Sequence, residues 1–182
     1  MIYLDYSANT PVDPRVLEVY CRTEQNFIGN PNSTHCAGQA ARQEMNRVTG
    51  LIAAQLGVLP EEIIYTSGAT EANNLALKGT ARAARHVGRH IISTPLEHSS
   101  VGATLTALQQ QGYEIDLLDI GRDGRVDLDQ LRELMRDDTI LVAVCAVDSE
   151  LGTIQPIREI AGIVKPYPGC RLHVDATQAV GK

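Results

Sequence analysis

The chain has 182 residues, 43% of them apolar, and this length and content are typical of one globular domain with a sizeable core. Its formal net charge of −6 excludes a basic surface for nucleic acid and a polybasic segment for an anionic membrane. The first residues lack the regions of a secretory signal, and no apolar run approaches the ~20 residues that span a bilayer. We therefore expect a cytoplasmic protein whose partners include neither nucleic acid nor a membrane.

The four cysteines are scattered along the chain, at Cys21, Cys36, Cys145 and Cys170. Their spacing lacks the paired pattern of zinc ligands, and their number is too low for a disulfide scaffold. We therefore expect reduced thiols and no metal site.

The first part of the chain predicts an extended arm followed by two helices. Residues 1–12 are expected to form the arm, because Pro11 and the nearby Pro14 discourage anything but a turn or a helix start. A helix is expected at 14–26, where Asp13 can cap a proline at the first helical position. Turn formers at 29–35 come next, and apolar residues at three- and four-residue steps then predict a long helix at 38–56.

Strands and helices alternate after residue 60, a pattern typical of a mostly parallel sheet with helices on both faces. The expected strands are 63–66, 90–93, 113–118, 140–144 and 171–174. The expected helices are 71–84, 101–110, 127–134 and 156–164. We therefore predict a three-layer α/β fold, with an arm at 1–12 and one large domain at 13–182.

Polar residues follow three of the expected strands. They are 67–70, the pair Glu97 and His98, and 175–178. Because the ends of parallel strands share one edge of the sheet, where ligands bind in open α/β folds, these residues should converge.

Residues 67–70 lead through Gly68 into a helix N-terminus, whose unpaired N–H groups and dipole can hold a phosphate. An ordinary helix cap at Thr70 is the alternative. His98 can stack on an aromatic cofactor or transfer protons near neutral pH, and the alternative is a surface or capping histidine.

Asp175 follows an apolar strand, where a carboxylate is costly unless it meets a cation. A protonated pyridine nitrogen is one such cation, and pairing with the carboxylate would keep it protonated. The alternative is a cap for a following helix.

Six motifs occur along the chain in an order found in one known family. They lie at 3–8, 29–35, 65–76, 97–98, 152–157 and 173–178. Together they resemble the cysteine desulfurases, pyridoxal-phosphate enzymes of the class V aminotransferase group, and most closely the branch that supplies iron-sulfur cluster assembly. The resemblance implies the large domain of the pyridoxal-phosphate-dependent transferase fold, and a reaction that converts L-cysteine to L-alanine and leaves a persulfide on the enzyme.

The resemblance also implies a role for each polar residue of the expected site. Thr70, with the backbone near Ala69, would hold the phosphate of pyridoxal 5'-phosphate. His98 would stack on the cofactor ring and assist proton transfers as a catalytic residue. Asp175 would pair with the pyridine nitrogen, and Gln178 would reach the phenolic oxygen of the ring.

One segment departs from the family pattern. The family usually has Val-Asn-Asn-Glu-Ile-Gly where this chain has residues 147–152. Ser149 replaces the asparagine that contacts the phenolic oxygen, and its hydroxyl is shorter. Asp148 adds a negative charge, which would oppose an anionic phenolate unless it points away.

The family's Schiff-base lysine comes after the Asp175 motif, in a Ser-x-His-Lys context beyond the residues present here. Its persulfide-forming cysteine, substrate-binding arginine and small C-terminal domain are not matched either. We therefore expect residues 13–182 to be an incomplete large domain, from a truncated product or a split enzyme, and inactive by itself. The resemblance implies a homodimer or a complementing C-terminal half as partner, and a scaffold protein as sulfur acceptor.

Two other functions stay open. The first is another class V enzyme, such as a selenocysteine lyase or an aminotransferase, although 67–71 and the Asp175 motif resemble the desulfurases more closely. The second is a non-catalytic scaffold or half-subunit that pairs with a related chain. The presence of Thr70, His98, Asp175 and Gln178 argues against the second.

Overall fold

The computed structural model describes residues 2–181, so Met1 and Lys182 lie outside the description. The chain forms two compact units, Met1–Tyr65 and Thr66–Lys182, and each is described by itself. The predicted boundary between an arm at 1–12 and a large domain at 13–182 stays a prediction. None of the helices in the described part is both long and apolar enough to cross a membrane.

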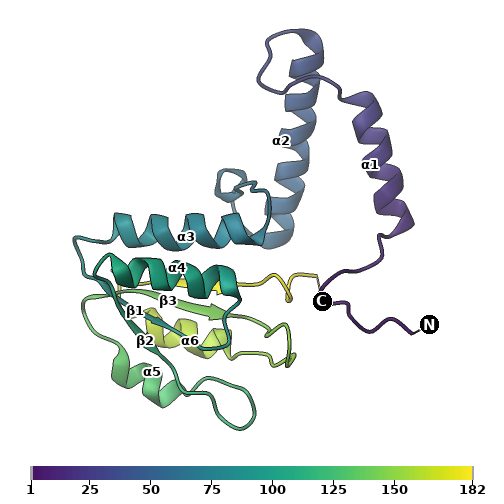
Figure 1. Cartoon of the computed structure of the whole chain (residues 1–182). Coiled ribbons are helices and arrows are strands. Elements are labelled where there is room, and N and C mark those ends of the chain that lie inside the picture. The colour runs from purple at the N-terminus through teal and green to yellow at the C-terminus, as the bar shows by residue number, and fades with distance from the viewer. Residues whose placement is uncertain (1, 182) are drawn as a thin grey trace. The chain divides into compact units, whose positions relative to one another are not determined.

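The first unit contains helices α1 (Pro14–Asn26) and α2 (Cys36–Leu56) and a short 3-10 helix, η1 (Pro60–Glu62), all labelled or traceable by colour in Figure 1. Asp13 caps α1 as predicted, because its carboxylate accepts the N–H of Arg15 at 2.8 Å. The predicted helix at 14–26 is confirmed. However, α1 buries none of its residues, so its apolar face is exposed.

Helix α2 begins two residues before the predicted start because His35 caps it. The His35 Nδ1 accepts the N–H of Gly38 at 3.2 Å. Gly38 also lets the preceding loop pack closely, since a Cβ there would meet the carbonyl oxygens of Asn30 and Ser33 at 2.6 Å. The helix ends where predicted, with Gly57 in the left-handed conformation (φ 69°) that glycine favours.

Residues 63–66 form no strand, so that prediction is wrong. The backbone of Ile63 is extended (φ −86°, ψ 120°), as the apolar run indicated. A strand also needs a neighbour to complete its hydrogen bonds, and no described strand pairs with this segment. Ile64 and Tyr65 are accordingly 68% and 57% exposed.

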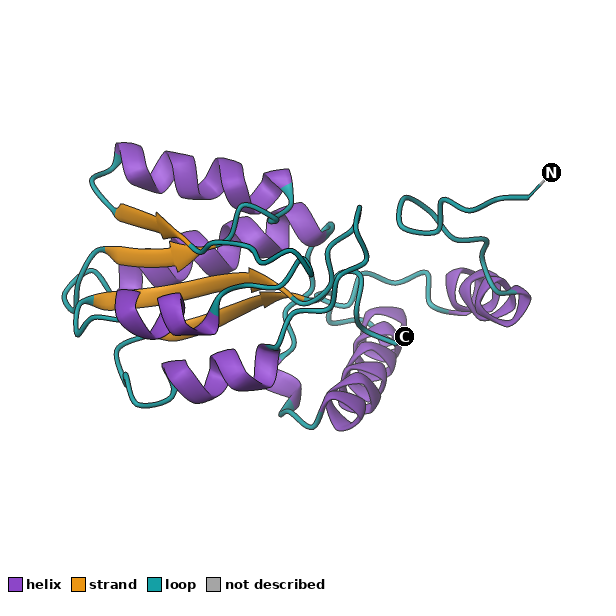
Figure 2. Ribbon diagram, turned by 90° about the horizontal axis from the view of Figure 1, so that it is seen from below, coloured by secondary structure: helices purple, strands orange, loops and turns teal. Residues whose placement is uncertain are grey.

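The second unit is a four-stranded parallel sheet between two layers of helices (Figures 1 and 2), which confirms the predicted three-layer α/β fold. The strands in spatial order are β2 (Glu114–Leu117), β1 (His90–Ser93), β3 (Thr139–Cys145) and β4 (Arg171–Asp175). The helices are α3 (Ala69–Ala83) and α4 (Ser99–Gln110) on one face, and α5 (Leu128–Leu134) and α6 (Ile157–Val164) on the other.

Alternate residues of the central strands fill two separate cores. Ile91 and Leu141 pack with the side chains of α3 and α4. Ile92 and Val142 point the other way and pack with α5 and α6. This division follows from the two-residue repeat of a strand. Every residue of β3 is buried, as its nearly all-apolar sequence predicted.

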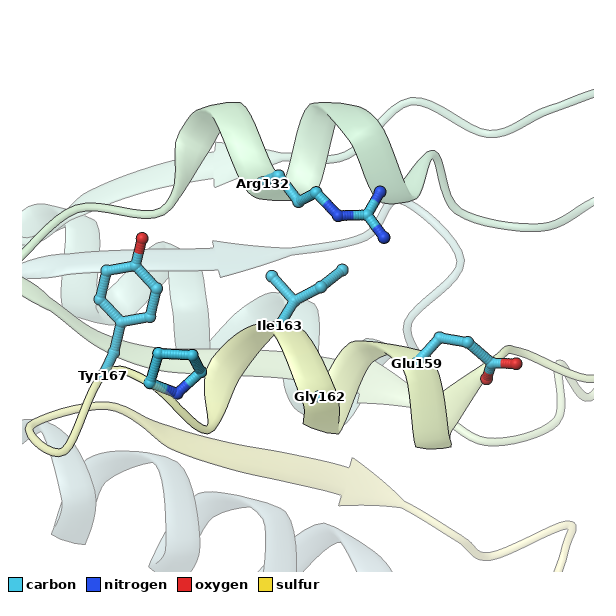
Figure 3. A pocket seen from close by; sticks show the side chains of 6 residues that line it. Arg132, Glu159, Gly162, Ile163 and Tyr167 are labelled. Carbon is cyan, nitrogen blue, oxygen red and sulfur yellow. The ribbon is translucent and has the colours of Figure 1, made fainter.

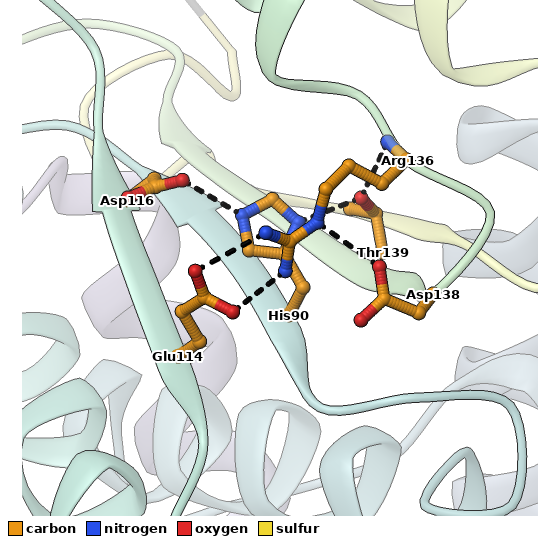
Figure 4. Close-up of polar contacts among 6 residues, drawn as sticks. All are labelled: His90, Glu114, Asp116, Arg136, Asp138 and Thr139. Atoms are coloured by element: carbon orange, nitrogen blue, oxygen red, sulfur yellow. Dashed lines mark hydrogen bonds and ion pairs between the residues drawn. The ribbon is translucent and has the colours of Figure 1, made fainter.

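A polar cluster joins the amino ends of three strands (Figure 4), and we call it the His90 cluster. His90 of β1 is fully buried, and its Nδ1 lies 2.7 Å from the Thr139 hydroxyl of β3. Its Nε2 lies 3.1 Å from a carboxylate oxygen of Asp116 in β2. Arg136, just before β3, forms an ion pair at 2.8 Å with Glu114 of β2. These bonds fix the three strands relative to one another at the edge opposite their carboxyl ends.

Candidate functional site

The site residues predicted from the sequence lie at helix starts and in loops around the carboxyl edge of the sheet. Ala69 and Thr70 open α3, His98 directly precedes α4, Ser149 lies after β3, Asp175 ends β4, and Gln178 lies in the next turn. Parallel strands present such residues on one side, which is where open α/β sheets bind ligands.

The N-terminus of α3 has no side-chain cap. The helix begins at Ala69, two residues before the predicted start, and its cap residue is Gly68. Thr70 is the second helical residue, so an ordinary cap at Thr70 is excluded. The carboxylate of Glu71 turns back and accepts the N–H and hydroxyl of Ser67, both at 2.7 Å. The first N–H groups of α3 and the exposed hydroxyl of Thr70 thus remain available for an anion.

Asp175 presents an ionised carboxylate at the sheet edge. One oxygen accepts the N–H and hydroxyl of Thr177 at 3.0 and 2.6 Å, and the other accepts the amide of Asn73 at 2.9 Å. Burial raises the pKa of this carboxyl, but the bonds from Thr177 and Asn73 outweigh burial and hold the pKa below its ordinary value. Residues 177–181 form a turn, so no helix capped by Asp175 is present in the described part of the chain. With three of about four acceptor positions used, the carboxylate can still meet a cation.

Asn73 connects Asp175 to His98, and it was not among the site residues predicted from the sequence. Asn73 is 4% exposed, and its amide nitrogen donates to Asp175 and to the Ser100 hydroxyl, the latter at 3.0 Å. Its amide oxygen lies 3.1 Å from Nε2 of His173. The Ser100 hydroxyl in turn lies 2.9 Å from Nδ1 of His98. We call these five residues the Asn73 network.

A signal for Asn73 was present in the sequence. Asn73, Leu77 and Ala81 follow at four-residue steps, and all three are buried. A polar residue on the apolar face of a helix needs hydrogen-bond partners, so it marks a polar site inside the fold.

His98 has the capping role that the sequence offered as the alternative, and its role toward a cofactor stays a prediction. It caps α4, because its Nδ1 accepts the N–H of Ser100 at 3.2 Å. Its ring is exposed, and no group in residues 2–181 bonds its Nε2. One ring nitrogen therefore holds the helix start, while the other is available for a ligand or a proton.

Glu97, next to His98, holds the loop that leads into α4. One carboxylate oxygen accepts the N–H of Cys145 at the end of β3 (2.7 Å) and the hydroxyl of Thr94 (2.9 Å). The other oxygen is buried and has no partner among the described residues. Burial is the main reason that the pKa of Glu97 is raised to about 7, and the negative charge of Asp175 adds a smaller part of that rise.

The segment that departs from the family pattern forms a turn after β3. Asp148 is 7% exposed, and its carboxylate accepts the N–H groups of Glu150 and Leu151. Its charge therefore faces into its own turn. Ser149 is exposed and makes no side-chain hydrogen bond within residues 2–181, whereas Gln178 is half-buried. The cofactor roles of Ser149 and Gln178 stay predictions.

A surface pocket of about 510 Å³ lies elsewhere, between α5 and α6 (Figure 3). Its lining residues are Arg132, Glu159, Gly162, Ile163, Pro166 and Tyr167. None of them belongs to the predicted site, and Arg132 is already paired with Asp129. Within the described residues, no group of histidines, cysteines and acids is arranged to hold a metal ion.

Comparison with known proteins gives a consistent result. The family model for aminotransferase class-V matches residues 2–182. The putative cysteine desulfurase IscS 1 of Bacillus subtilis is 45% identical over 180 residues, which cover 99% of this chain and 47% of that protein. Cysteine desulfurase IscS of Proteus mirabilis is 46% identical over 184 residues, with 100% and 45% covered.

Solved structures agree with these relatives. A NifS-like protein superposes with a TM-score of 0.95 at 40% identity, covering 100% of this chain and 50% of that one. A complex of SspA with cysteine has a TM-score of 0.87 at 33% identity, covering 94% and 49%. The chain thus spans about half the length of the proteins that it matches. It belongs to the aminotransferase class-V family.

Proposed function

We propose that this chain supplies the cofactor-binding part of a pyridoxal-phosphate-dependent cysteine desulfurase. One observation carries the proposal: the ionised carboxylate of Asp175 is joined through buried Asn73 and Ser100 to His98, beside the uncapped N-terminus of α3. The relatives named cysteine desulfurase, and the similar protein solved with cysteine, favour L-cysteine as substrate.

The residues present fit pyridoxal 5'-phosphate. The phosphate would take the first N–H groups of α3 and the hydroxyl of Thr70, with the backbone near Ala69. Thr70 and Asn73 lie three residues apart on one helix, ~4.5 Å along its axis, so the anion seat is close to the Asn73 bond with Asp175. His98 would lie against the ring.

Asp175 would pair with the pyridine nitrogen, and Ser149 and Gln178 would face the phenolic oxygen. The bound cofactor would supply an electron sink for the substrate. Asp175 would keep the ring nitrogen protonated, because its own pKa is held low. His98 would donate or accept a proton at Nε2.

In the proposed reaction the carbon–sulfur bond of L-cysteine breaks and the sulfur passes to a cysteine thiol of the enzyme. The products are L-alanine and an enzyme persulfide, so atoms and electrons balance without an added oxidant or reductant. We further propose a cytoplasmic enzyme that acts as a homodimer, or with a complementing half, and passes sulfur to a scaffold protein for iron-sulfur clusters.

The test is a titration of the protein with pyridoxal 5'-phosphate, followed by absorbance. L-cysteine and a complementing C-terminal half are then added, and L-alanine and sulfide are measured. We expect saturable binding that Asp175→Asn weakens at least about tenfold, because a bond between charged groups is lost. Asp123→Asn removes the same charge from an exposed turn and is the matched control. Equal affinity of the two variants, or no saturable binding, would contradict the proposal. A preference for L-selenocysteine would assign the chain to the lyases instead.

A further inference from the structure

We infer that Asn73 is a positioning residue, which orients Asp175 and fixes the ring proton of His98 on Nε2 by way of Ser100. The inference deepens the proposed function and depends on it for the ligand, but the hydrogen-bond arrangement stands on its own geometry. Asn73 touches neither a ligand nor a reacting atom, so it acts entirely through its partners.

The orientation of the Asn73 amide follows from Asp175. An ionised carboxylate only accepts hydrogen bonds, so the group 2.9 Å from it must be the amide nitrogen. The amide oxygen then faces Nε2 of His173, which must carry a proton to donate. His173 can donate this proton as a neutral ring, because burial lowers the pKa of His173. The negative charge of Asp175 acts in the opposite direction on that pKa, but burial is the larger effect.

The direction of the bond at Ser100 follows in turn. The second N–H of the Asn73 amide donates to the Ser100 oxygen at 3.0 Å. This leaves the hydroxyl proton of Ser100 to point at Nδ1 of His98, 2.9 Å away. The backbone N–H of Ser100 points at the same nitrogen, at 3.2 Å.

Nδ1 of His98 is therefore an acceptor twice over, and a neutral ring must carry its proton on Nε2. Nε2 is the nitrogen that no group in residues 2–181 bonds. Asn73 is thus the donor toward both ends of the network. Its amide donates to Asp175 and to Ser100, and Ser100 in turn donates to His98. It presents an N–H at the exposed end of His98 and a carboxylate at Asp175 to the same ligand.

Burial makes this arrangement costly to disturb. Asn73 and Ser100 are 4% and 7% exposed, so water can replace their bonds only poorly. In Asn73→Leu the side chain keeps a similar size but loses both donors. In Ser100→Ala only the hydroxyl is lost. This removes the link to His98 and the acceptor for one Asn73 N–H, while the bond from Asn73 to Asp175 is kept.

Two measurements on the purified protein test the inference. Nitrogen-15 spectra of the histidine side chains report which ring nitrogen of His98 carries the proton, with or without cofactor. We expect the Nε2–H form in the unaltered protein, and a shift of about fivefold toward the Nδ1–H form in Ser100→Ala and Asn73→Leu. Titration with pyridoxal 5'-phosphate should show affinity about tenfold weaker for Asn73→Leu, because Asp175 loses its amide donor.

Two matched controls lie next in the sequence. Asn74→Leu changes the same helix, but Asn74 bonds Lys78 and the backbone of Thr70 and lies outside the network. Ser99→Ala changes an exposed serine beside Ser100. Both should leave the His98 ring proton on Nε2. If Asn73→Leu fails to fold, Ser100→Ala decides the ring-proton question alone.

An Nδ1–H form of His98 in the unaltered protein would overturn the inference, and so would identical spectra in Ser100→Ala and Ser99→Ala. Absence of cofactor binding with the expected ring-proton shifts would refute the proposed function and support the Asn73 assignment. Normal cofactor binding with no ring-proton shift would refute the Asn73 assignment and support the proposed function.

Discussion

Replacing Glu97 by glutamine should stabilise the protein above neutral pH. Burial raises the pKa of Glu97 from 4.5 to about 7, so the folded state binds this proton more tightly than the unfolded chain does. Stability should therefore fall as the pH rises from about 4.5, and it should level off above about pH 7. The Glu97→Gln variant carries no charge at this position, so its stability should not fall over this range of pH.

The magnitude follows from the change in pKa. At about 1.4 kcal/mol for each pH unit, a rise from 4.5 to about 7 corresponds to about 3 kcal/mol of unfolding free energy. Glutamine can keep the oxygen that accepts from Cys145 and Thr94, and it places an uncharged amide where the other carboxylate oxygen is buried without a described partner. We expect Glu97→Gln to be up to about 3 kcal/mol more stable at pH 8 and nearly equal to the unaltered protein at pH 4.5.

Urea unfolding between pH 4.5 and 8 measures this difference. Glu71→Gln is a control of opposite sign, because the bond from the Ser67 N–H lowers the pKa of exposed Glu71. That bond stabilises the fold above pH 4.5, and its contribution disappears as the pH falls through the lowered pKa. A stability difference for Glu97→Gln that stays constant with pH, or that changes in the same direction as for Glu71→Gln, would refute the reasoning.

Three further predictions concern the fold. Gly88→Ala should lower the free energy of unfolding in urea by about 1–3 kcal/mol, because the new Cβ would overlap the backbone carbonyl of Asp138. Gly79 lies in open space on a helix, so Gly79→Ala should raise that free energy by up to about 1 kcal/mol. Leu141→Ala, at a side chain that is 1% exposed, should cost about 2–5 kcal/mol in the same assay, and a cost near zero would contradict the described core. In the folded protein at pH 8, iodoacetamide should label the two exposed cysteines and not the two buried ones, as mass spectrometry can show. Burial raises the pKa of the buried thiols to about 12 and about 11. The exposed pair is Cys21 and Cys36, and the buried pair is Cys145 and Cys170.

Periodicity in the sequence predicted most of the helices and strands, because each of these buries one face or both. Three helices begin two residues before their predicted starts, because their cap residues are His35, Gly68 and His98, of which the sequence offered only His98 as a cap. The strand expected at 63–66 failed for a different reason. Apolar residues can favour an extended backbone, but only a neighbouring strand completes a sheet.

The site could be predicted as far as strand ends could be located. His98 comes after β1 and Asp175 ends β4, so the topology alone places them on one edge. Asn73 could not be placed in the same way, because its partners Ser100 and Asp175 lie 27 and 102 residues away in the chain. Which distant groups meet inside the fold depends on how α3 packs across the sheet, and the residue pattern of α3 does not contain that information.

The His90 cluster has a consequence for how the protein can change. Because His90, Thr139 and Asp116 join β1, β3 and β2 at their amino ends, these three strands are also held together at the edge opposite the ligand loops. We therefore expect these three strands to stay aligned when a loop at the ligand edge changes in length. Relatives of this chain are then expected to differ more in these loops than in the sheet that carries them.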